Sequence, residues 1–138
     1  MRYVVLLSVF VLSSARAEEV VKTDSDKMQG VWLIKKVSIG GKKMDVPEGL
    51  TAVIKQNSFV IQLEGIASEE KCDFELDSAA KLRTMDFVAG KGKIVGLAIY
   101  KLEGDKLTIC MGDKKRPEKF ASEKGSGVRL SVFERKAK

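Results

Sequence analysis

The side chains that could do chemistry in this chain are carboxylates, lysines, arginines, hydroxyls and two cysteines, because the sequence contains no histidine. Without an imidazole the chain cannot form a Ser-His-Asp or Cys-His arrangement, and it lacks the commonest zinc ligand. No two acidic, lysine or tyrosine side chains are spaced so as to suggest a general acid and a general base. The sequence therefore predicts no enzyme, no catalytic residue, no metal and no cofactor.

Two glycine-containing segments resemble known motifs only superficially. Ser126 lies between Gly125 and Gly127, which is not the Gly-x-Ser-x-Gly spacing of a nucleophile elbow. The segment 90–93, Gly-Lys-Gly-Lys, lacks both the spacing and the terminal Ser or Thr of a phosphate-binding loop. Both segments are typical of turns between strands.

A row of carboxylates alternates with apolar residues in the segment 71–77. Asp73, Glu75 and Asp77 share one face of the predicted strand, and Cys72, Phe74 and Leu76 share the other. Carboxylates in a row on a strand lack the converging geometry of a calcium site. We interpret them as a solvated face, with the apolar residues facing the core.

The first residues have the pattern of a secretory signal peptide. Arg2 precedes an apolar run from Val4 to Leu12, and Ala15-Arg16-Ala17 supplies small residues before a cleavage point at Glu18. The apolar run, about nine residues, is far shorter than the ~20 needed to span a bilayer as a helix. We therefore expect a signal peptide at 1–17, one domain at 18–138, no membrane span, and a secreted or periplasmic protein that is a monomer.

Charge gives a weaker indication of partners. The chain has a formal net charge of +6, but its lysines occur as scattered pairs mixed with carboxylates and without interleaved aromatic residues. This pattern favours a solvated surface and no nucleic-acid partner. A basic outer face that binds an envelope protein or polymer remains an alternative.

The segments that must position these residues read as a series of short strands. Asp24 or Asp26 can cap a helical turn that ends before Gly30. In the most regular part of the sequence, a two-residue turn at Gly104-Asp105 pairs Leu102 with Leu107 and Tyr100 with Ile109. The predicted strands are 31–38, 50–55, 59–63, 71–77, 82–88, 97–102, 106–110 and 128–135.

Eight strands with short connections indicate an all-β, eight-stranded antiparallel up-and-down barrel. The interior of such a barrel is just wide enough to be filled by side chains or to hold one small ligand. Tyr100 is the clearest polar group expected inside. The candidate ligand-binding residues of the interior are Trp32, Phe59, Ile61, Phe74, Met85, Phe87, Tyr100 and Ile109. Alternation in the last strand adds Leu130 and Val132 to the expected inner face.

Several spaced motifs are similar to a family of small secreted bacterial lipocalin-like domains, and more distantly to the lipocalin superfamily. The resemblance begins at Gly30-x-Trp32 and covers about 24–135. It continues through Leu97-x-Ile99-Tyr100-x-Leu102-x-Gly104-Asp105-x-Leu107-x-Ile109-Cys110, Arg116-Pro117-x-x-Phe120-x-Ser122 and Gly125-Ser126-Gly127, and ends at Arg135. It implies a lipocalin-like barrel with a short N-terminal helical turn in an exported protein. It also implies that Arg135 stacks on Trp32 and closes one barrel end. With Leu130 and Val132 inward, this contact requires a bulge or a strand end.

Export would permit a Cys72–Cys110 disulfide. However, Cys110 is expected to face away from Tyr100, whereas Cys72 is expected to point inward with Phe74. Both the disulfide and two free thiols therefore remain open.

The longest connection, 112–127, is the other place where binding residues are expected. It is a candidate cover for the barrel mouth, in which Arg116 or Lys119 offers a charge to an acidic head group and Phe120 shields the interior. The alternative is that Phe120 folds back to fill an apolar gap at the end of the barrel.

Two functions follow from these expectations. The first is an exported carrier that binds one small, mostly apolar molecule in the barrel. The second is a cell-envelope structural or interaction module with a filled barrel and a functional basic surface. A cavity inside the barrel would favour the first.

Overall fold

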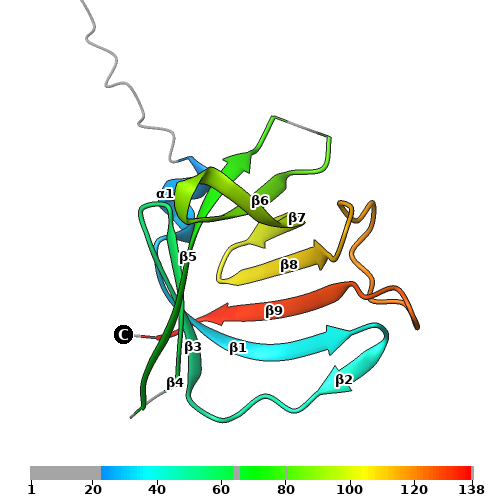
Figure 1. Cartoon of the computed structure of the whole chain (residues 1–138). Coiled ribbons are helices and arrows are strands. Elements are labelled where there is room, and N and C mark those ends of the chain that lie inside the picture. The colour runs from blue at the N-terminus through cyan, green and yellow to red at the C-terminus, as the bar shows by residue number, and fades with distance from the viewer. Residues whose placement is uncertain (1–22, 64–65, 80, 138) are drawn as a thin grey trace, which may run out of the picture.

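The computed structural model describes residues 23–63, 66–79 and 81–137. The predicted signal peptide, 1–17, lies outside the described residues. The described chain forms one antiparallel sheet that closes on itself, with a single short α-helix at one end of the barrel (Figure 1).

Consecutive strands of the barrel are neighbours in the sheet, so the topology is up-and-down, and the short strand of residues 42–44 lies outside this order because it pairs with the first strand alone. In chain order the elements are α1 (Asp24–Met28), β1 (Gly30–Ile39), β2 (Lys42–Met44), β3 (Leu50–Lys55), β4 (Ser58–Leu63), β5 (Ile66–Asp77), β6 (Thr84–Ala89), the 3-10 turn η1 (Gly90–Gly92), β7 (Lys93–Glu103), β8 (Lys106–Gly112) and β9 (Arg129–Arg135). Pairing of β1 with β9 closes the barrel, which is built from β1 and β3 to β9. The predicted eight-stranded antiparallel lipocalin-like barrel is confirmed.

The hairpin of β7 and β8 has the predicted register. Leu102 pairs with Leu107, and Tyr100 pairs with Ile109. The helical turn also forms, but its cap is Thr23, and neither Asp24 nor Asp26 occupies that position. The Thr23 hydroxyl accepts a hydrogen bond from the Asp26 N–H, and the Asp26 carboxylate accepts one from the Thr23 N–H.

The structure differs from the sequence prediction in two strands. The three residues of β2 are all exposed and pair with the end of β1, so no apolar alternation signals them. In β9 the inward residues are Ser131 and Phe133, which are 8% and 4% exposed, in place of Leu130 and Val132. Both faces of β9 carry apolar side chains, so alternation alone could not show which face points into the barrel.

Large side chains fill one end of the barrel. Met28, Trp32 and Tyr100 are buried there, with Met85 and Phe74 in the same core. We call this the closed end, because α1 lies next to it (Figure 1). The opposite end, where β8 leads into the long connection to β9, is called the open end.

Candidate functional site

The closed end is sealed by Arg135 and Trp32, the two residues that the resemblance pairs. The Arg135 guanidinium lies 4.3 Å from the centre of the Trp32 ring, which is a cation–π distance. It also donates hydrogen bonds to the Gln29 carbonyl, at 2.8 Å, and to the Lys27 carbonyl. The Trp32 indole N–H donates to the Met28 carbonyl at 2.9 Å. Arginine and tryptophan together thus hold α1 to the barrel.

The bulge or strand end that this contact was expected to require followed from placing Leu130 and Val132 inward, and that placement was wrong. The pairing of β1 with β9 shifts between Ile34 and Lys36. Arg135 lies at the end of β9 opposite Trp32, and it has the same parity as Ser131 and Phe133. The inward face of β9 therefore leads directly to the Trp32 ring.

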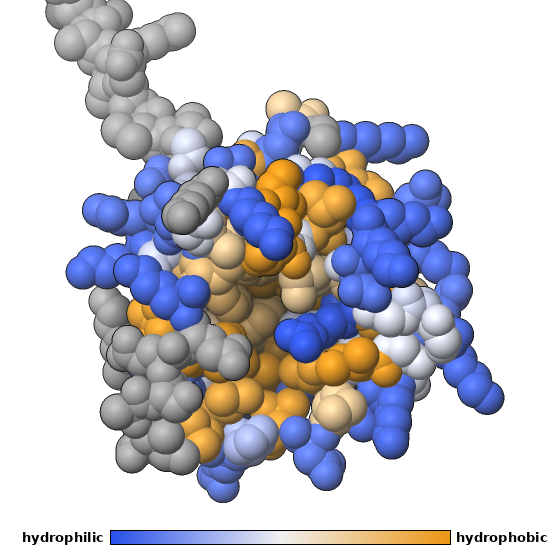
Figure 2. Space-filling model, viewed as in Figure 1, coloured by the Kyte–Doolittle hydropathy of each residue, from blue (hydrophilic) through white to orange (hydrophobic). Residues whose placement is uncertain are grey.

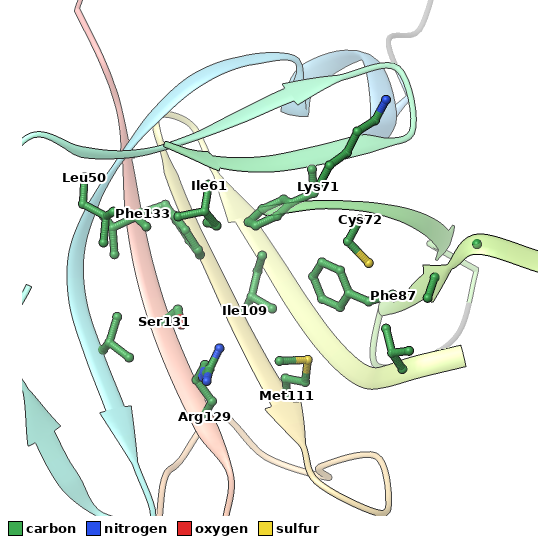
Figure 3. Close-up of a pocket in the computed structure, with 16 residues that line it drawn as sticks. Leu50, Ile61, Lys71, Cys72, Phe87, Ile109, Met111, Arg129, Ser131 and Phe133 are labelled. Carbon is green, nitrogen blue, oxygen red and sulfur yellow. The ribbon is translucent and has the colours of Figure 1, made fainter. Parts of the chain in front are cut away.

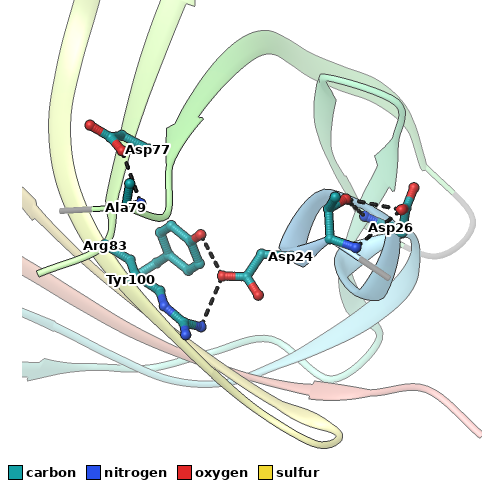
Figure 4. Close-up of polar contacts among 7 residues, drawn as sticks. Asp24, Asp26, Asp77, Ala79, Arg83 and Tyr100 are labelled. Atoms are coloured by element: carbon teal, nitrogen blue, oxygen red, sulfur yellow. Dashed lines mark hydrogen bonds and ion pairs between the residues drawn. The ribbon is translucent and has the colours of Figure 1, made fainter. Parts of the chain in front are cut away.

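Tyr100 has a structural partner and does not line a cavity. Its hydroxyl donates to Asp24 at 2.8 Å, and Arg83 donates to the same carboxylate oxygen at 2.9 Å (Figure 4). Burial, followed by the hydrogen bond to Asp24, raises the pKa of Tyr100. Tyr100 was a candidate ligand-binding residue, but α1 uses its hydroxyl and its side chain does not line the cavity described below.

A cavity of about 570 Å³ occupies the other part of the barrel. Apolar side chains surround a hollow on the face seen in Figure 2, and Figure 3 shows the side chains that line the cavity. Its lining residues are Ile34, Val37, Leu50, Phe59, Ile61, Lys71, Cys72, Phe87, Ala89, Gly90, Val95, Ile109, Met111, Arg129, Ser131 and Phe133. The volume lies within the range of small-molecule pockets, roughly 300–1,000 Å³.

The predicted lining residues divide between the two ends. Phe59, Ile61, Phe87 and Ile109 line the cavity. The others are buried in the core but do not reach it, and they are Trp32, Phe74, Met85 and Tyr100. The barrel is thus filled at one end and hollow at the other, which strand alternation cannot distinguish.

Sequence reasoning missed the contribution of β9. Arg129, Ser131 and Phe133 all line the cavity, since they alternate on its inner face. The sequence signal that could have found them is Arg135, because placing it on Trp32 fixes the parity of the whole strand.

Two cavity residues bring polar groups that face inward. Ser131 is 8% exposed, and Arg129 lies two residues away on the same face of β9. Within the described residues, neither side chain has a hydrogen-bond or ion-pair partner. Lys71 differs, because its ammonium group points away from the cavity in Figure 3.

The Cys72 thiol also faces the cavity, but it is engaged by backbone. It donates to the Val88 carbonyl at 3.4 Å, and burial raises its pKa. Cys110 lies on the outer face of β8, fully buried beneath the connection to β9, where its thiol contacts the carbonyls of Lys119 and Ala121. Both cysteines are free, so the structure contains no Cys72–Cys110 disulfide.

The long connection between β8 and β9 does not cover the cavity. Arg116 contacts Asp86 on the outer face of β6, with 2.7 Å between nitrogen and oxygen, and donates to the Ala98 carbonyl at 2.7 Å. Lys119 pairs with Glu123, and the Phe120 ring lies under the Lys101 ammonium at 5.0 Å. The expected mouth positions of Arg116, Lys119 and Phe120 are thereby corrected, because these residues pack against the outside of the barrel.

The described residues contain no group of three or more acidic or cysteine side chains placed to hold a metal ion. In the same part of the chain, no helix is long and apolar enough to cross a membrane. Comparisons with protein-family models, curated proteins and solved structures give no match. The fold and the cavity therefore define the protein as an up-and-down β-barrel with an apolar cavity at one end.

Proposed function

We propose that this protein is an exported carrier that binds one small, mostly apolar molecule inside its barrel. The observation that supports the proposal is the apolar cavity at the open end, whose volume is about 570 Å³. Aromatic rings from Phe59, Phe87 and Phe133 form much of its wall. An apolar ligand there would lose contact with water over most of its surface, which favours binding by roughly 25 cal/mol per Å².

Contacts among the aromatic rings of the cavity wall support the same proposal. Phe59 contacts both Phe87 and Phe133 edge to face, with ring centres 5.5 and 6.0 Å apart. Such ring pairs stabilise this arrangement of the wall, which reduces the ordering that a ligand has to impose on binding. The envelope-module alternative rests on a filled barrel, and the cavity counts against it.

A neutral fluorescent probe tests the carrier proposal directly. N-phenylnaphthylamine should bind the full-length mature protein with enhanced fluorescence, at about one probe per chain. Met111→Trp, which adds volume to the cavity wall, should weaken that binding about tenfold or more. Val60→Trp is the matched control, because Val60 lies between Phe59 and Ile61 on β4 and so faces the opposite side of the sheet.

Native mass spectrometry of protein purified without denaturation from its own host then identifies the occupant. We expect a reproducible added mass that disappears on unfolding. Absence of probe binding together with an unliganded mass would contradict the carrier proposal and favour a function on the outer surface.

A further inference from the structure

We propose that the ligand of this cavity is an apolar molecule with a carboxylate head, and that Arg129 and Ser131 bind that head. This inference rests on the carrier function proposed above and specifies its ligand class. It starts from two polar side chains that a cavity for a purely apolar molecule does not need.

Ser131 provides the first observation. The residue is 8% exposed and lines the cavity, yet its hydroxyl has no hydrogen-bond partner among the described residues. The hydroxyl is not among the fully enclosed polar atoms that lack a partner, so it is accessible from the cavity. Ile109, its neighbour on β8, and Val37, its neighbour on β1, offer no side-chain acceptor. A ligand oxygen would supply the missing partner.

Arg129 provides the second observation and the charge. It pairs with Met111 across the sheet and lies next to the Ser131 and Met111 side chains at the cavity wall (Figure 3). Residues two apart on a strand lie on one face, about 7 Å apart along it. The guanidinium and the hydroxyl can therefore contact the same small group.

The chemistry of these two donors favours a carboxylate. A guanidinium presents parallel N–H groups that match the two oxygens of a carboxylate, and the serine hydroxyl adds a third donor. A phosphate monoester carries a charge of about −1.5 to −2 at neutral pH and would require more than one cation. The next cation of the lining, Lys71, directs its ammonium away from the cavity (Figure 3).

The position of the donors fixes the orientation of the ligand. Arg129 begins β9 at the open end and is exposed to solvent, whereas Phe133 lies further along the same face toward the closed end. The head would therefore lie near the mouth, where the ligand charge stays partly hydrated, and the apolar chain would lie against the phenylalanines.

The test compares three twelve-carbon compounds that differ only in the head group: laurate, dodecanol and dodecylamine. Each is titrated into the full mature protein by calorimetry and by displacement of N-phenylnaphthylamine. We expect laurate to bind about tenfold more tightly than dodecanol, and dodecylamine to bind more weakly than both.

Variants assign that preference to the two side chains. Arg129→Gln should reduce laurate affinity about tenfold and leave dodecanol and probe binding unchanged, and Ser131→Ala should have the same selectivity with a smaller loss. Lys36→Gln is the matched control: Lys36 is exposed, pairs with Val132 on the outer face of the sheet and does not line the cavity, so its removal should preserve the laurate preference. Unchanged probe binding shows that each variant keeps its fold and cavity.

The outcomes separate this inference from the function on which it rests. Equal affinity for laurate and dodecanol, or loss of the preference in Lys36→Gln and not in Arg129→Gln, overturns the carboxylate site while the carrier function stands. No binding of any of the three compounds or the probe overturns both.

Discussion

At the residue scale, Gly30 shows how one position allows the closed end to form. Its φ is +124°, a conformation that residues with a side chain rarely adopt. A Cβ at this position would lie 3.2 Å from Arg135 Nη1, which donates to the adjacent Gln29 carbonyl. The glycine two residues before Trp32 therefore allows the backbone to pass close to the guanidinium that covers the indole ring.

We expect Gly30→Ala to lower the free energy of unfolding by about 1–3 kcal/mol, because it combines backbone strain with displacement of Arg135. Urea unfolding followed by circular dichroism measures the change. Gly90→Ala is the control, since Gly90 has no positive φ and no atom lies within 4 Å of a Cβ placed there. Equal stability of the two variants would contradict this account of Gly30.

At the element scale, the connection of residues 113–128 behaves as a cover on the outer wall. Arg116 binds the connection to β6 and β7 through Asp86 and the Ala98 carbonyl. Backbone carbonyls of the connection lie over the Cys110 thiol. Its far end is fixed to the turn between β1 and β2, where the Gly41 N–H donates to the Ser122 hydroxyl at 2.9 Å. Because Cys110 is fully buried under this segment, its reactivity reports whether the segment is closed.

Loss of the Arg116 anchor should open this segment more often. In a Cys72→Ala background, which leaves Cys110 as the only thiol, we expect Arg116→Gln to increase the rate of Cys110 modification by a maleimide about tenfold. Lys119→Gln should change the rate little, because Lys119 pairs only with an exposed glutamate. A rate that rises equally in both variants would show that Arg116 does not hold the segment closed.

The elements also show what sequence patterns could and could not predict. The hairpin of β7 and β8 was predicted in register, because a Gly-Asp turn leaves only one pairing that aligns the apolar residues. The inward-facing side of β9 was not predicted correctly. Leu130, on its outer face, pairs with Cys110, so both faces of the strand contain apolar residues. The role of 113–128 was also missed, because a segment rich in lysine gives no signal that it packs on a sheet.

At the scale of the whole molecule, the two ends of the barrel have different tasks. At the closed end Asp24 links α1 to Tyr100 and Arg83, which come from different parts of the chain. Which end is filled depends on how the side chains of eight strands meet in space. Alternation predicted the inward face of most strands, but it could not place Phe59 at the cavity and Phe74 in the filled core.

The hydroxyl of Tyr100 should make the stability of the whole barrel sensitive to alkaline pH. In the unfolded chain a tyrosine ionises near pH 10, whereas the fold raises the pKa of Tyr100 and keeps its proton bound. The stabilisation is therefore complete below about pH 10 and declines as the pH rises above it.

We expect Tyr100→Phe to cost about 1 kcal/mol near neutral pH, and the difference from the native protein to shrink above about pH 10. Urea unfolding of both proteins at a series of pH values measures this difference and removes the contribution of the lysines, which both share. A difference that stays constant up to about pH 11 would show that this hydroxyl does not couple folding to protonation.

The filled end also gives the barrel a floor. A molecule that enters at Arg129 can extend only as far as the side chains packed around Phe74 and Met85. The depth of the cavity therefore limits the length of the ligand's apolar part. Chains that are too long would lift their head groups away from β9, and short ones would leave part of the wall uncovered. The same packing that holds the barrel together would thereby set the length of the molecule that it accepts.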